Sequence, residues 1–426
     1  MARRGGMALA LLPAFSRPSA TGAELDARDL IAQFEKTLKD NIVAFWYPKC
    51  LDREAGGYTM NFGQQGEPLG PGRKMIVTQA RMVWFFAAVA RAGYSGPGWD
   101  RKELLDAAEH GYRFLLERMR DAVHDGYYWE VDATGLKVTR PEKTVYGHSF
   151  VLYALAEYAM ATGRKDVLEQ AVRLFQLLED KTHDRVHGGY REAFQADWRP
   201  VQGNGPMGPA DLKLMNSHLH MLEAVTLFYQ ASKLPEARER LLELMTIAGN
   251  TMVRKDAGAC TDKYSLDWTP RLEGNYNRVS YGHDLEAVWL LMEACDVAGV
   301  PNSLYMDLYR TLWNYSLRFG FDENNGGFYD SGPLGKPADN LNKVWWVQAE
   351  TLVSALRMYR ATRDPVYRTA FEKLWRFLRE RQIDWKYGEW HDTILADGRV
   401  RGNKAHMWKA AYHNGRAMLE CIRLLK

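Results

Sequence analysis

Apolar residues recur along much of the chain with the spacing of an α-helix. After His283, apolar side chains stand in the i, i+3, i+4, i+7 pattern of one buried stripe, at Leu285, Val288, Trp289, Met292 and Cys295. Such runs come in pairs, because residues 165–179 follow a turn at Gly163 and residues 307–319 follow a turn at Gly299. Strand-like alternation is scarce, so the pattern predicts an all-α protein built from helix pairs.

The first helix of each pair begins with one repeated layout, which occurs six times. An aromatic-rich turn is followed by a polar or histidine residue and then by the apolar run. Four copies are predicted to place a histidine at the same point, namely His148, His220, His283 and His413. The other two copies carry Arg81 and Trp346 instead. Regular recurrence of this kind indicates one supersecondary unit used repeatedly.

A second repeated element, a glycine–aromatic turn, lies between successive pairs. It occurs at residues 56–58, 126–128, 188–190, 326–328 and 388–390, and short aromatic stretches such as 127–131 are expected to pair as small hairpins. Six helix pairs with hairpins at one rim predict an (α/α)6 barrel. A linear solenoid is the structural alternative, and it is disfavoured because the terminal units are no more polar than the central ones.

The length of 426 residues permits several ordinary domains, but the repeat favours a single barrel domain over residues 27–426. Residues 1–26 are predicted to be a flexible leader. The alternative is a weak secretory signal, because Arg3 and Arg4 precede a short apolar run at residues 7–12. No stretch reaches the roughly 20 apolar residues that would span a bilayer, so no membrane association is expected.

Cysteine usage favours a reducing compartment. The four cysteines are far apart and lack metal-binding or disulfide spacing: Cys50, Cys260, Cys295 and Cys421. We therefore expect a cytoplasmic protein, with export as the alternative if the leader is a signal.

Charge and aromatic content narrow the class of partner. The chain has 56 basic and 53 acidic residues and no basic stripe, so nucleic acid is not an expected partner. Aromatic residues make up 12% of the chain and include 14 tryptophans, many beside Gly, Asp or Asn in turns. This surplus suits a carbohydrate-binding cleft, because sugar C–H faces pack on indole rings. We expect a monomer that binds a small sugar.

In a closed ring, the starts of the six inner helices face one cavity, so the six anchor residues are expected to line a common pocket. Two histidines there have a carboxylate three residues further on, in the pairs His220 with Glu223 and His283 with Glu286. Each pair shares a helix face. A neighbouring carboxylate fixes the tautomer of an imidazole and raises its basicity, which is typical of a general base.

Several functional classes fit these residues to different degrees. A metal site is one alternative, since His220, Glu223, His283 and Glu286 offer nitrogen and oxygen ligands, but compact ligand spacing is missing and no metal is predicted. A glycoside hydrolase using Glu286 and Glu350 leaves the inner histidines without a purpose. A non-catalytic sugar-binding protein is a further alternative.

Proton abstraction beside a carbonyl uses histidines, an arginine and aromatic platforms together. In an open-chain aldose, removal of the C2 proton gives an enediolate whose oxygen must be stabilised. Two bases on opposite faces of that plane invert C2. One base that returns the proton to C1 instead makes a ketose.

Four segments of the chain carry a family resemblance. They are Asn216-Ser-His-Leu-His220-Met-Leu-Glu-Ala224, Tyr281-Gly-His283-Asp-Leu-Glu286-Ala-Val-Trp289, Lys343-Val-Trp-Trp346-Val-Gln-Ala-Glu350 and Lys409-Ala-Ala-Tyr-His413-Asn-Gly-Arg416. These segments resemble the signature segments of cellobiose 2-epimerases, which belong to the N-acylglucosamine 2-epimerase superfamily. The similarity runs over nearly the whole chain from about residue 27. Mannose- or N-acylglucosamine-converting enzymes and aldose–ketose isomerases are the alternatives.

The resemblance implies an (α/α)6 barrel, no required cofactor, and epimerisation of the reducing-end glucose of β-1,4-linked disaccharides, with cellobiose and lactose as expected substrates. It implies His283 and His413 as the acid/base pair at C2, His220 as an aid to ring opening, and Arg81 as the group that stabilises the enediolate oxygen. Glu286 and Glu350 are expected to orient histidines or bind hydroxyls. The other expected sugar contacts are Tyr146, Asn216, Trp289, Trp346 and Trp408.

Overall fold

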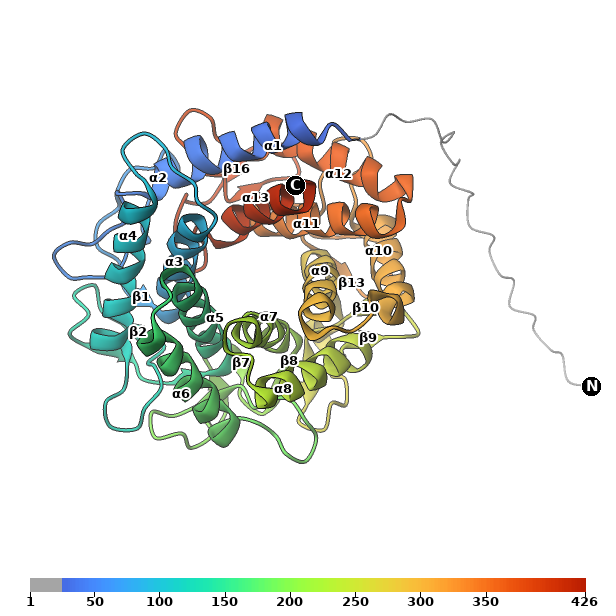
Figure 1. Cartoon of the computed structure of the whole chain (residues 1–426). Coiled ribbons are helices and arrows are strands. Elements are labelled where there is room, and N and C mark those ends of the chain that lie inside the picture. The colour runs from blue at the N-terminus through green and yellow to red at the C-terminus, as the bar shows by residue number, and fades with distance from the viewer. Residues whose placement is uncertain (1–24) are drawn as a thin grey trace, which may run out of the picture.

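The chain forms two concentric rings of helices (Figure 1). This computed structural model describes residues 25–426, so nearly all of the predicted leader lies outside the described residues. The inner ring consists of α3 (Ile76–Arg91), α5 (Val145–Thr162), α7 (Met215–Ser232), α9 (Tyr281–Ala298), α11 (Trp345–Thr362) and α13 (Tyr412–Leu425). The outer ring consists of α1 (Ala27–Lys36), α4 (Arg101–Phe114), α6 (Lys165–Lys181), α8 (Pro235–Thr246), α10 (Met306–Gly320) and α12 (Pro365–Phe377).

The inner ring is closed. Each inner helix contacts the next one along the chain, and α13 contacts α3, so the last unit packs against the first. The (α/α)6 barrel predicted from the repeat is confirmed, and the linear solenoid is wrong. None of the described helices is long and apolar enough to cross a membrane.

Short non-α helical turns extend several of the outer helices or precede them. The π-helical turns are η1 (Thr37–Val43), η2 (Leu115–Met119), η3 (Ile247–Thr251) and η6 (Leu378–Gln382), and η1 leads into the single turn α2 (Ala44–Trp46). Two 3₁₀ turns are η4 (Gly274–Tyr276) and η5 (Asn302–Tyr305).

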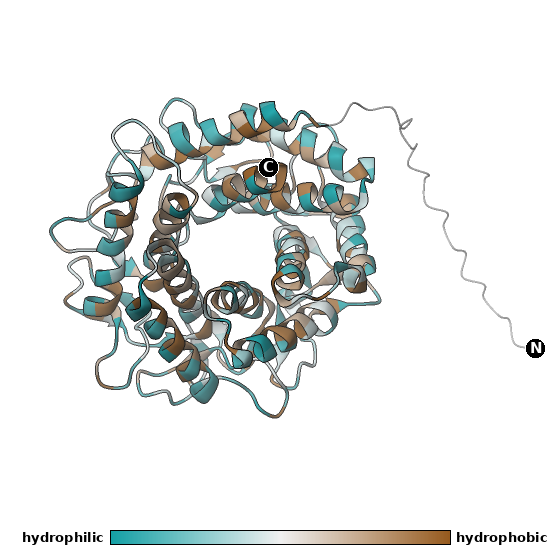
Figure 2. Cartoon of the chain, viewed as in Figure 1, coloured by the Kyte–Doolittle hydropathy of each residue, from teal (hydrophilic) through white to brown (hydrophobic). Residues whose placement is uncertain are grey.

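Burial differs between the two rings, and Figure 2 shows the difference as hydropathy. Outer helices bury one stripe; in α6 it consists of Val167, Ala171, Leu174, Phe175 and Leu178. Inner helices are buried nearly all round, because they pack against the outer ring on one side and against each other and the barrel axis on the other. The single stripe that the sequence predicts on α9 is therefore too narrow, since the opposite face of α9 is buried as well.

Short antiparallel strands border the N-terminal ends of the inner helices. They are β1 (Lys74–Met75), β2 (Glu130–Val131), β3 (Val138–Arg140), β4 (Lys143–Thr144), β5 (Ala193–Phe194), β6 (Asn204–Gly205), β7 (Gly208–Pro209), β8 (Leu212–Leu214), β9 (Val253–Arg254), β10 (Ala259–Cys260), β11 (Lys263–Ser265), β12 (Arg278–Ser280), β13 (Ser331–Pro333), β14 (Lys343–Val344), β15 (Thr393–Ile394) and β16 (Val400–Arg401). The strand before an inner helix pairs with a strand of the following unit, as β1 pairs with β2 and β4 with β5. This pairing fixes the start of one inner helix relative to the next.

Five of the six units contain a glycine–aromatic turn, and in each of these five a lysine–aspartate pair holds the turn in place. In the third unit, Lys213 Nζ lies 2.8 Å from Asp184 Oδ2 and also donates to the Gly188 carbonyl at 2.6 Å. Gly188 and Gly189 both adopt positive φ, of 72° and 71°, which glycine tolerates without strain. The same pairing joins Lys74 to Asp52, Lys143 to Asp121, Lys343 to Asp322 and Lys404 to Asp384. The turns therefore hold the rim where the inner helices begin.

Candidate active site

The inner-helix histidines do not share one register, so the prediction of a single repeated point is wrong. Counted from the first residue of each helix, His148 is fourth in α5, His220 is sixth in α7, His283 is third in α9 and His413 is second in α13. Because α13 begins one residue later in this register, His283 and His413 occupy equivalent positions, and the other two histidines do not. The equivalent of His148 in α7 is His218. Successive helix positions point in different directions, so these histidines cannot all have the same role.

The fourth-position residues hold the hairpins. His148 Nε2 accepts from the Tyr127 backbone N–H at 2.9 Å, and its Nδ1 lies 2.6 Å from the Thr144 carbonyl. His218 makes the same two contacts, with Tyr190 and Leu214. In α3 and α11 the position is glutamine, and Gln79 and Gln348 accept the equivalent N–H with their side-chain oxygens. Both ring nitrogens of His148 are thus engaged in the fold, which leaves it without a free nitrogen for chemistry.

The sixth-position residues meet near the barrel axis. They are Arg81, Phe150, His220, Glu286 and Glu350, and in α13 the corresponding place is filled by Arg416, the fifth residue of that helix. These six side chains form one layer across the barrel axis, which we call the floor. We call the space between the floor and the N-terminal ends of the inner helices the chamber.

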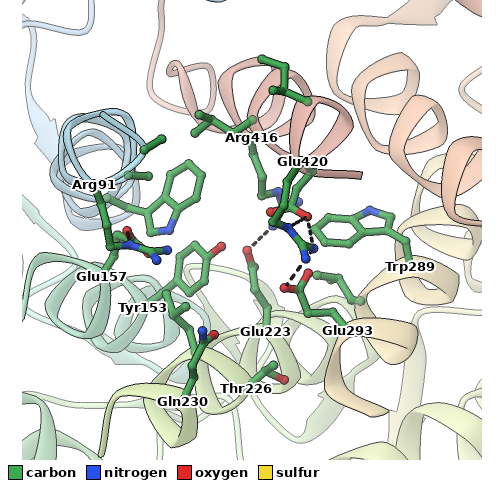
Figure 3. Close-up of a pocket in the computed structure, with 18 of the residues that line it drawn as sticks. Arg91, Tyr153, Glu157, Glu223, Thr226, Gln230, Trp289, Glu293, Arg416 and Glu420 are labelled. Atoms are coloured by element: carbon green, nitrogen blue, oxygen red, sulfur yellow. Dashed lines mark hydrogen bonds and ion pairs between the residues drawn. The ribbon is translucent and has the colours of Figure 1, made fainter. Parts of the chain in front are cut away.

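Arg416 is the centre of that floor. Its guanidinium bonds Glu223, lies 2.7 Å from Glu286 Oε1 and 2.8 Å from Glu350 Oε2, and all four side chains are buried. Figure 3 shows Arg416 reaching toward Glu223 from α13. Tyr412 adds a hydrogen bond to Glu223 Oε2 at 2.6 Å. One cation therefore organises three carboxylates from α7, α9 and α11.

Two histidines rest on these carboxylates through Nδ1. His220 Nδ1 lies 2.9 Å from Glu223 Oε2, and His413 Nδ1 lies 2.6 Å from Glu350 Oε1. A carboxylate accepts a proton-bearing Nδ1, so each neutral ring presents the lone pair of Nε2. This is the tautomer that a general base requires.

The pKa shifts of the buried groups favour neutral His220 and His413 and a charged Glu223. Burial, followed by the nearby arginines, lowers the pKa of His220 to about 4 even though Glu223 opposes the shift. Burial and then Arg81 and Arg416 lower the pKa of His413 well below its usual value. Burial works against the charge of Glu223, yet Arg416, His220 and Tyr412 together lower its pKa to about 2. Burial raises the pKa of Glu286 well above its usual value.

His283 differs from the other two because it makes no hydrogen bond to any residue within 25–426. It is half-buried, and its ring centroid lies 4.6 Å from that of Trp346. His413 contacts the same indole, with centroids 5.8 Å apart. Burial lowers the pKa of His283. His283 from α9 and His413 from α13 therefore approach one indole of the intervening helix α11.

Arg81 lies between two aromatic rings and has donors to spare. Its Cζ is 4.2 Å from the Phe150 ring centroid and 4.6 Å from that of Tyr412. It donates to the Trp408 carbonyl at 3.1 Å and to the Tyr146 hydroxyl at 3.2 Å, whereas its buried Nε has no partner among the described residues. Stacking fixes the plane of the guanidinium, so its N–H groups are aimed into the chamber without reorganisation.

The remaining predicted sugar contacts divide into two sets. Trp408 is 40% exposed and packs against Tyr146, while Asn216 is half-buried and its side-chain oxygen has no partner within the described chain. Together with Trp346 these groups edge the chamber. Trp289 has a different place from the expected one, because its Nε1 donates to Glu350 Oε2 at 3.0 Å and its ring packs under Arg416. Trp289 therefore supports the floor from the side that faces away from the histidines.

One cluster in the described chain has the spacing of metal ligands. Glu286, Glu350 and His413 offer ligand atoms that all lie within 4.8 Å of one another. The Arg416 guanidinium contacts one oxygen of each carboxylate, and His413 uses Nδ1 for Glu350. Glu286 Oε2 has no partner among the described residues, but the positive charge of Arg416 beside both carboxylates disfavours a divalent cation at this cluster.

Sequence reasoning missed the role of Arg416 and of Tyr412. Both lie inside the Lys409–Arg416 segment, in which a role was predicted only for His413. The available signal was an arginine in a buried stretch of α13 that includes Ala417 and Met418, where an unpaired charge is costly and implies buried acids.

Three comparisons with known proteins agree with one another. The family model of N-acylglucosamine 2-epimerase (GlcNAc 2-epimerase) matches residues 56–417. The cellobiose 2-epimerase of Ruminococcus albus is 32% identical over 404 residues, covering 92% of this chain and 98% of that protein. The cellobiose 2-epimerase of Bacteroides fragilis is 30% identical, with coverage of 92% and 98%. The solved structure of cellobiose 2-epimerase from Spirochaeta thermophila matches with a TM-score of 0.84 at 32% identity, covering 96% of this chain and 99% of that one.

Proposed function

Because the chain belongs to the N-acylglucosamine 2-epimerase family and is a sugar epimerase, an isomerase, we propose that it inverts C2 of the reducing-end glucose of β-1,4-linked disaccharides. Cellobiose would become glucosyl-mannose, and lactose would become epilactose. The observation that supports this most directly is the pair His283 and His413 at one indole, Trp346. Two imidazoles around one aromatic platform, one neutral as the base and the other protonated as the acid, suit proton transfer on both faces of a planar intermediate.

The reaction begins with opening of the pyranose ring, for which His220 is placed. Its free Nε2 is able to exchange a proton with the anomeric hydroxyl and the ring oxygen, while Glu223 holds Nδ1. Opening the ring creates the C1 aldehyde, and only then does the C2 hydrogen become acidic. Trp346 and Trp408 offer the aromatic surface on which the sugar rests during this step.

Inversion then requires two proton transfers that balance. One histidine of the pair takes the C2 proton, the electrons of that C–H bond form the C1–C2 double bond of a cis-enediolate, and the aldehyde oxygen becomes negative. The guanidinium of Arg81 stabilises that oxygen. The other histidine, which enters this step as an imidazolium, delivers its extra proton to the opposite face of C2 and becomes neutral, the carbonyl re-forms, and the ring closes as the epimer.

Each turnover leaves one histidine with an extra proton and the other with one fewer. The enzyme returns to its starting state by exchange with water, so solvent hydrogen enters the product at C2. A single base working on one face would return the same hydrogen, or place it on C1 and yield a ketose. Solvent exchange at C2 therefore distinguishes the mechanisms.

The decisive experiment is NMR of cellobiose incubated with the enzyme in D₂O. We expect glucosyl-mannose as the product, with deuterium at C2 in both epimers as equilibrium is approached. His283→Ala and His413→Ala are each expected to abolish epimerisation, with circular dichroism verifying the fold. Conversion without deuterium, or full activity in either variant, contradicts the two-base assignment. Release of monosaccharides would indicate a hydrolase, and a ketose as main product would indicate an isomerase.

A further inference from the structure

A cavity of about 360 Å³ lies at the end of the barrel opposite the N-terminal ends of the inner helices, where the histidines stand. It is formed by the C-terminal halves of α3, α5, α7, α9 and α13, and Figure 3 shows its side chains converging from these helices. Glu223, Arg416 and Trp289 line it on the inner side. The same residues form the floor of the catalytic chamber, so one layer of side chains divides the two spaces. We call this second space the distal cavity.

The charges around the distal cavity balance and are paired. Four acidic side chains, Glu157, Glu223, Glu293 and Glu420, face four basic ones, Arg91, Arg416, Arg423 and Lys426. Arg91 Nη2 lies 3.1 Å from Glu157 Oε2, and Arg423 Nε lies 3.0 Å from Glu420 Oε2. With no surplus of either sign, the cavity offers little attraction to an ion beyond what its own pairs already satisfy.

Three uncharged polar groups that line the cavity lack a partner among the described residues: the Tyr153 hydroxyl, the Gln230 amide and the buried Trp84 indole N–H. Tyr153 is only 8% exposed, yet its hydroxyl has no hydrogen-bond partner within residues 25–426. Figure 3 shows that hydroxyl pointing into the middle of the cavity, toward Glu223. The Gln230 amide, on α7 at the rim, also has no partner in the described chain, and the same view shows it beside Tyr153. Gln230 is exposed, and the Tyr153 hydroxyl borders the cavity (Figure 3), so both groups are open to hydrogen bonds from a ligand that enters it.

Aromatic surface surrounds these open groups. The Tyr153 ring stacks on Trp84, with centroids 5.2 Å apart and planes inclined by 12°, and Trp289 lies across the cavity. Aromatic walls combined with a few uncharged hydrogen-bonding groups are typical of sites for sugars and other polyols. The volume of the cavity suits one ring of monosaccharide size.

We infer that the distal cavity is a second, non-catalytic site that binds an uncharged polyol of monosaccharide size. The open groups Tyr153 and Gln230 hydrogen-bond hydroxyls of the ligand, and the rings of Trp84 and Tyr153 border its apolar face. This site goes beyond the proposed function, because neither Tyr153 nor Gln230 takes part in the proposed reaction. Its existence depends on the distal cavity alone.

The probes are myo-inositol and methyl β-D-glucopyranoside, which cannot open to an aldehyde and so cannot react by the proposed mechanism. Binding is measured by saturation-transfer NMR and calorimetric titration of the full chain, with and without saturating cellobiose. We expect at least one probe to bind, and to stay bound when cellobiose fills the catalytic chamber. Epimerisation of cellobiose is measured separately, so a failure of this inference and a failure of the proposed function give different results.

Three variants locate the binding. Tyr153→Phe removes only the open hydroxyl and is expected to weaken probe binding about fivefold to tenfold, the effect of one lost hydrogen bond. Ala92→Trp places a large ring at the exposed mouth of the distal cavity and is expected to abolish binding. Tyr112→Phe, on the outer helix α4, is the matched control and should leave binding unchanged.

The inference is overturned if neither probe binds the unaltered chain, or if cellobiose displaces the bound probe. It is equally overturned if Tyr153→Phe and Ala92→Trp bind the probe as tightly as the Tyr112→Phe control. Circular dichroism of all three variants ensures that a loss of binding reflects the cavity and not the fold.

Discussion

Glu350→Gln is a sharp perturbation because either orientation of the new amide creates a conflict. One oxygen of Glu350 accepts from His413 Nδ1 at 2.6 Å, and the other accepts from Trp289 Nε1 at 3.0 Å and from Arg416 at 2.8 Å. If the amide NH₂ faces Trp289 and Arg416, it meets two donors. If it faces His413, the ring must accept at Nδ1 and carry its proton on Nε2. That second tautomer has no lone pair to receive the C2 proton.

The size of the effect follows from what is lost. A correctly oriented general base contributes about 10²- to 10⁴-fold to a rate, which is roughly 3–5 kcal/mol of the barrier. Unfolding should become easier by about 1–3 kcal/mol, because in either orientation the buried Arg416 guanidinium loses the charge of one of its three carboxylate partners. Arg416 keeps Glu223 and Glu286, so the barrel should still fold. We therefore expect kcat to fall about 10²- to 10⁴-fold with a much smaller change in KM.

The assay is steady-state epimerisation of cellobiose, with C2 deuterium incorporation in D₂O as a second readout and thermal unfolding as a third. Glu130→Gln is the matched control, since Glu130 is equally buried and hydrogen-bonded, but to Arg73 and Thr139 at the rim. The control should lose some stability and keep its kcat. If Glu350→Gln retains kcat within about threefold while losing stability, or if the control loses as much kcat, the tautomer argument is refuted.

Three further predictions test other parts of the molecule. His148→Gln should stay active, because glutamine already occupies this position in α3. Burial lowers the pKa of His148 to about 4, so the unaltered chain loses stability as the pH falls from about 6.5 toward 4. The variant should lose less stability over the same range, which urea titrations at pH 7 and pH 5 would measure. Arg81→Lys should lower kcat/KM roughly 10- to 100-fold in the cellobiose assay, since lysine lacks the stacked planar fork; an unchanged value argues against an enediolate contact. Lys213→Met should lower the free energy of unfolding by about 3–5 kcal/mol, because it leaves Asp184 buried without its cation. A decrease below about 1 kcal/mol in chemical unfolding would show that this lysine–aspartate pair is dispensable.

The sequence allowed the fold to be predicted because the repeat is written in local features. Helix pairs such as residues 165–179 with the run before them, and turns such as Gly188–Tyr190, each follow from spacing and backbone preference within a few residues. Closure of the ring was predicted only indirectly, from the absence of polar end units. The lysine of each lysine–aspartate pair was not predicted, since it lies 15 to 25 residues from the carbonyl that it binds, as Lys213 lies 25 residues from Gly188.

The candidate site was predictable in its membership and not in its register. A difference of two residues separates His218 from His220, yet the first fastens a hairpin and the second faces Arg81 and Glu223. The sequence shows both histidines in one segment and does not show where the helix begins. Arg416 could not be paired with Glu223 in advance, because 193 residues separate them and only ring closure places α13 opposite α7, so that the two side chains meet across the axis (Figure 1).

The unit that carries His283 departs from the others, and its departure bears on the chemistry. Here the turn between β9 and β10 lacks the paired positive φ residues, and Asp284 replaces the glutamine or histidine of the fourth position, accepting from the Cys260 N–H at 3.1 Å. His283 itself is half-buried and has no hydrogen bond in the described chain, whereas His413 is buried and fixed by Glu350. The two proposed bases are therefore unequal. Glu350 holds His413 in one tautomer, whereas no hydrogen bond within the described chain fixes His283, so under the proposed mechanism we expect solvent hydrogen to enter first at the face of C2 beside His283.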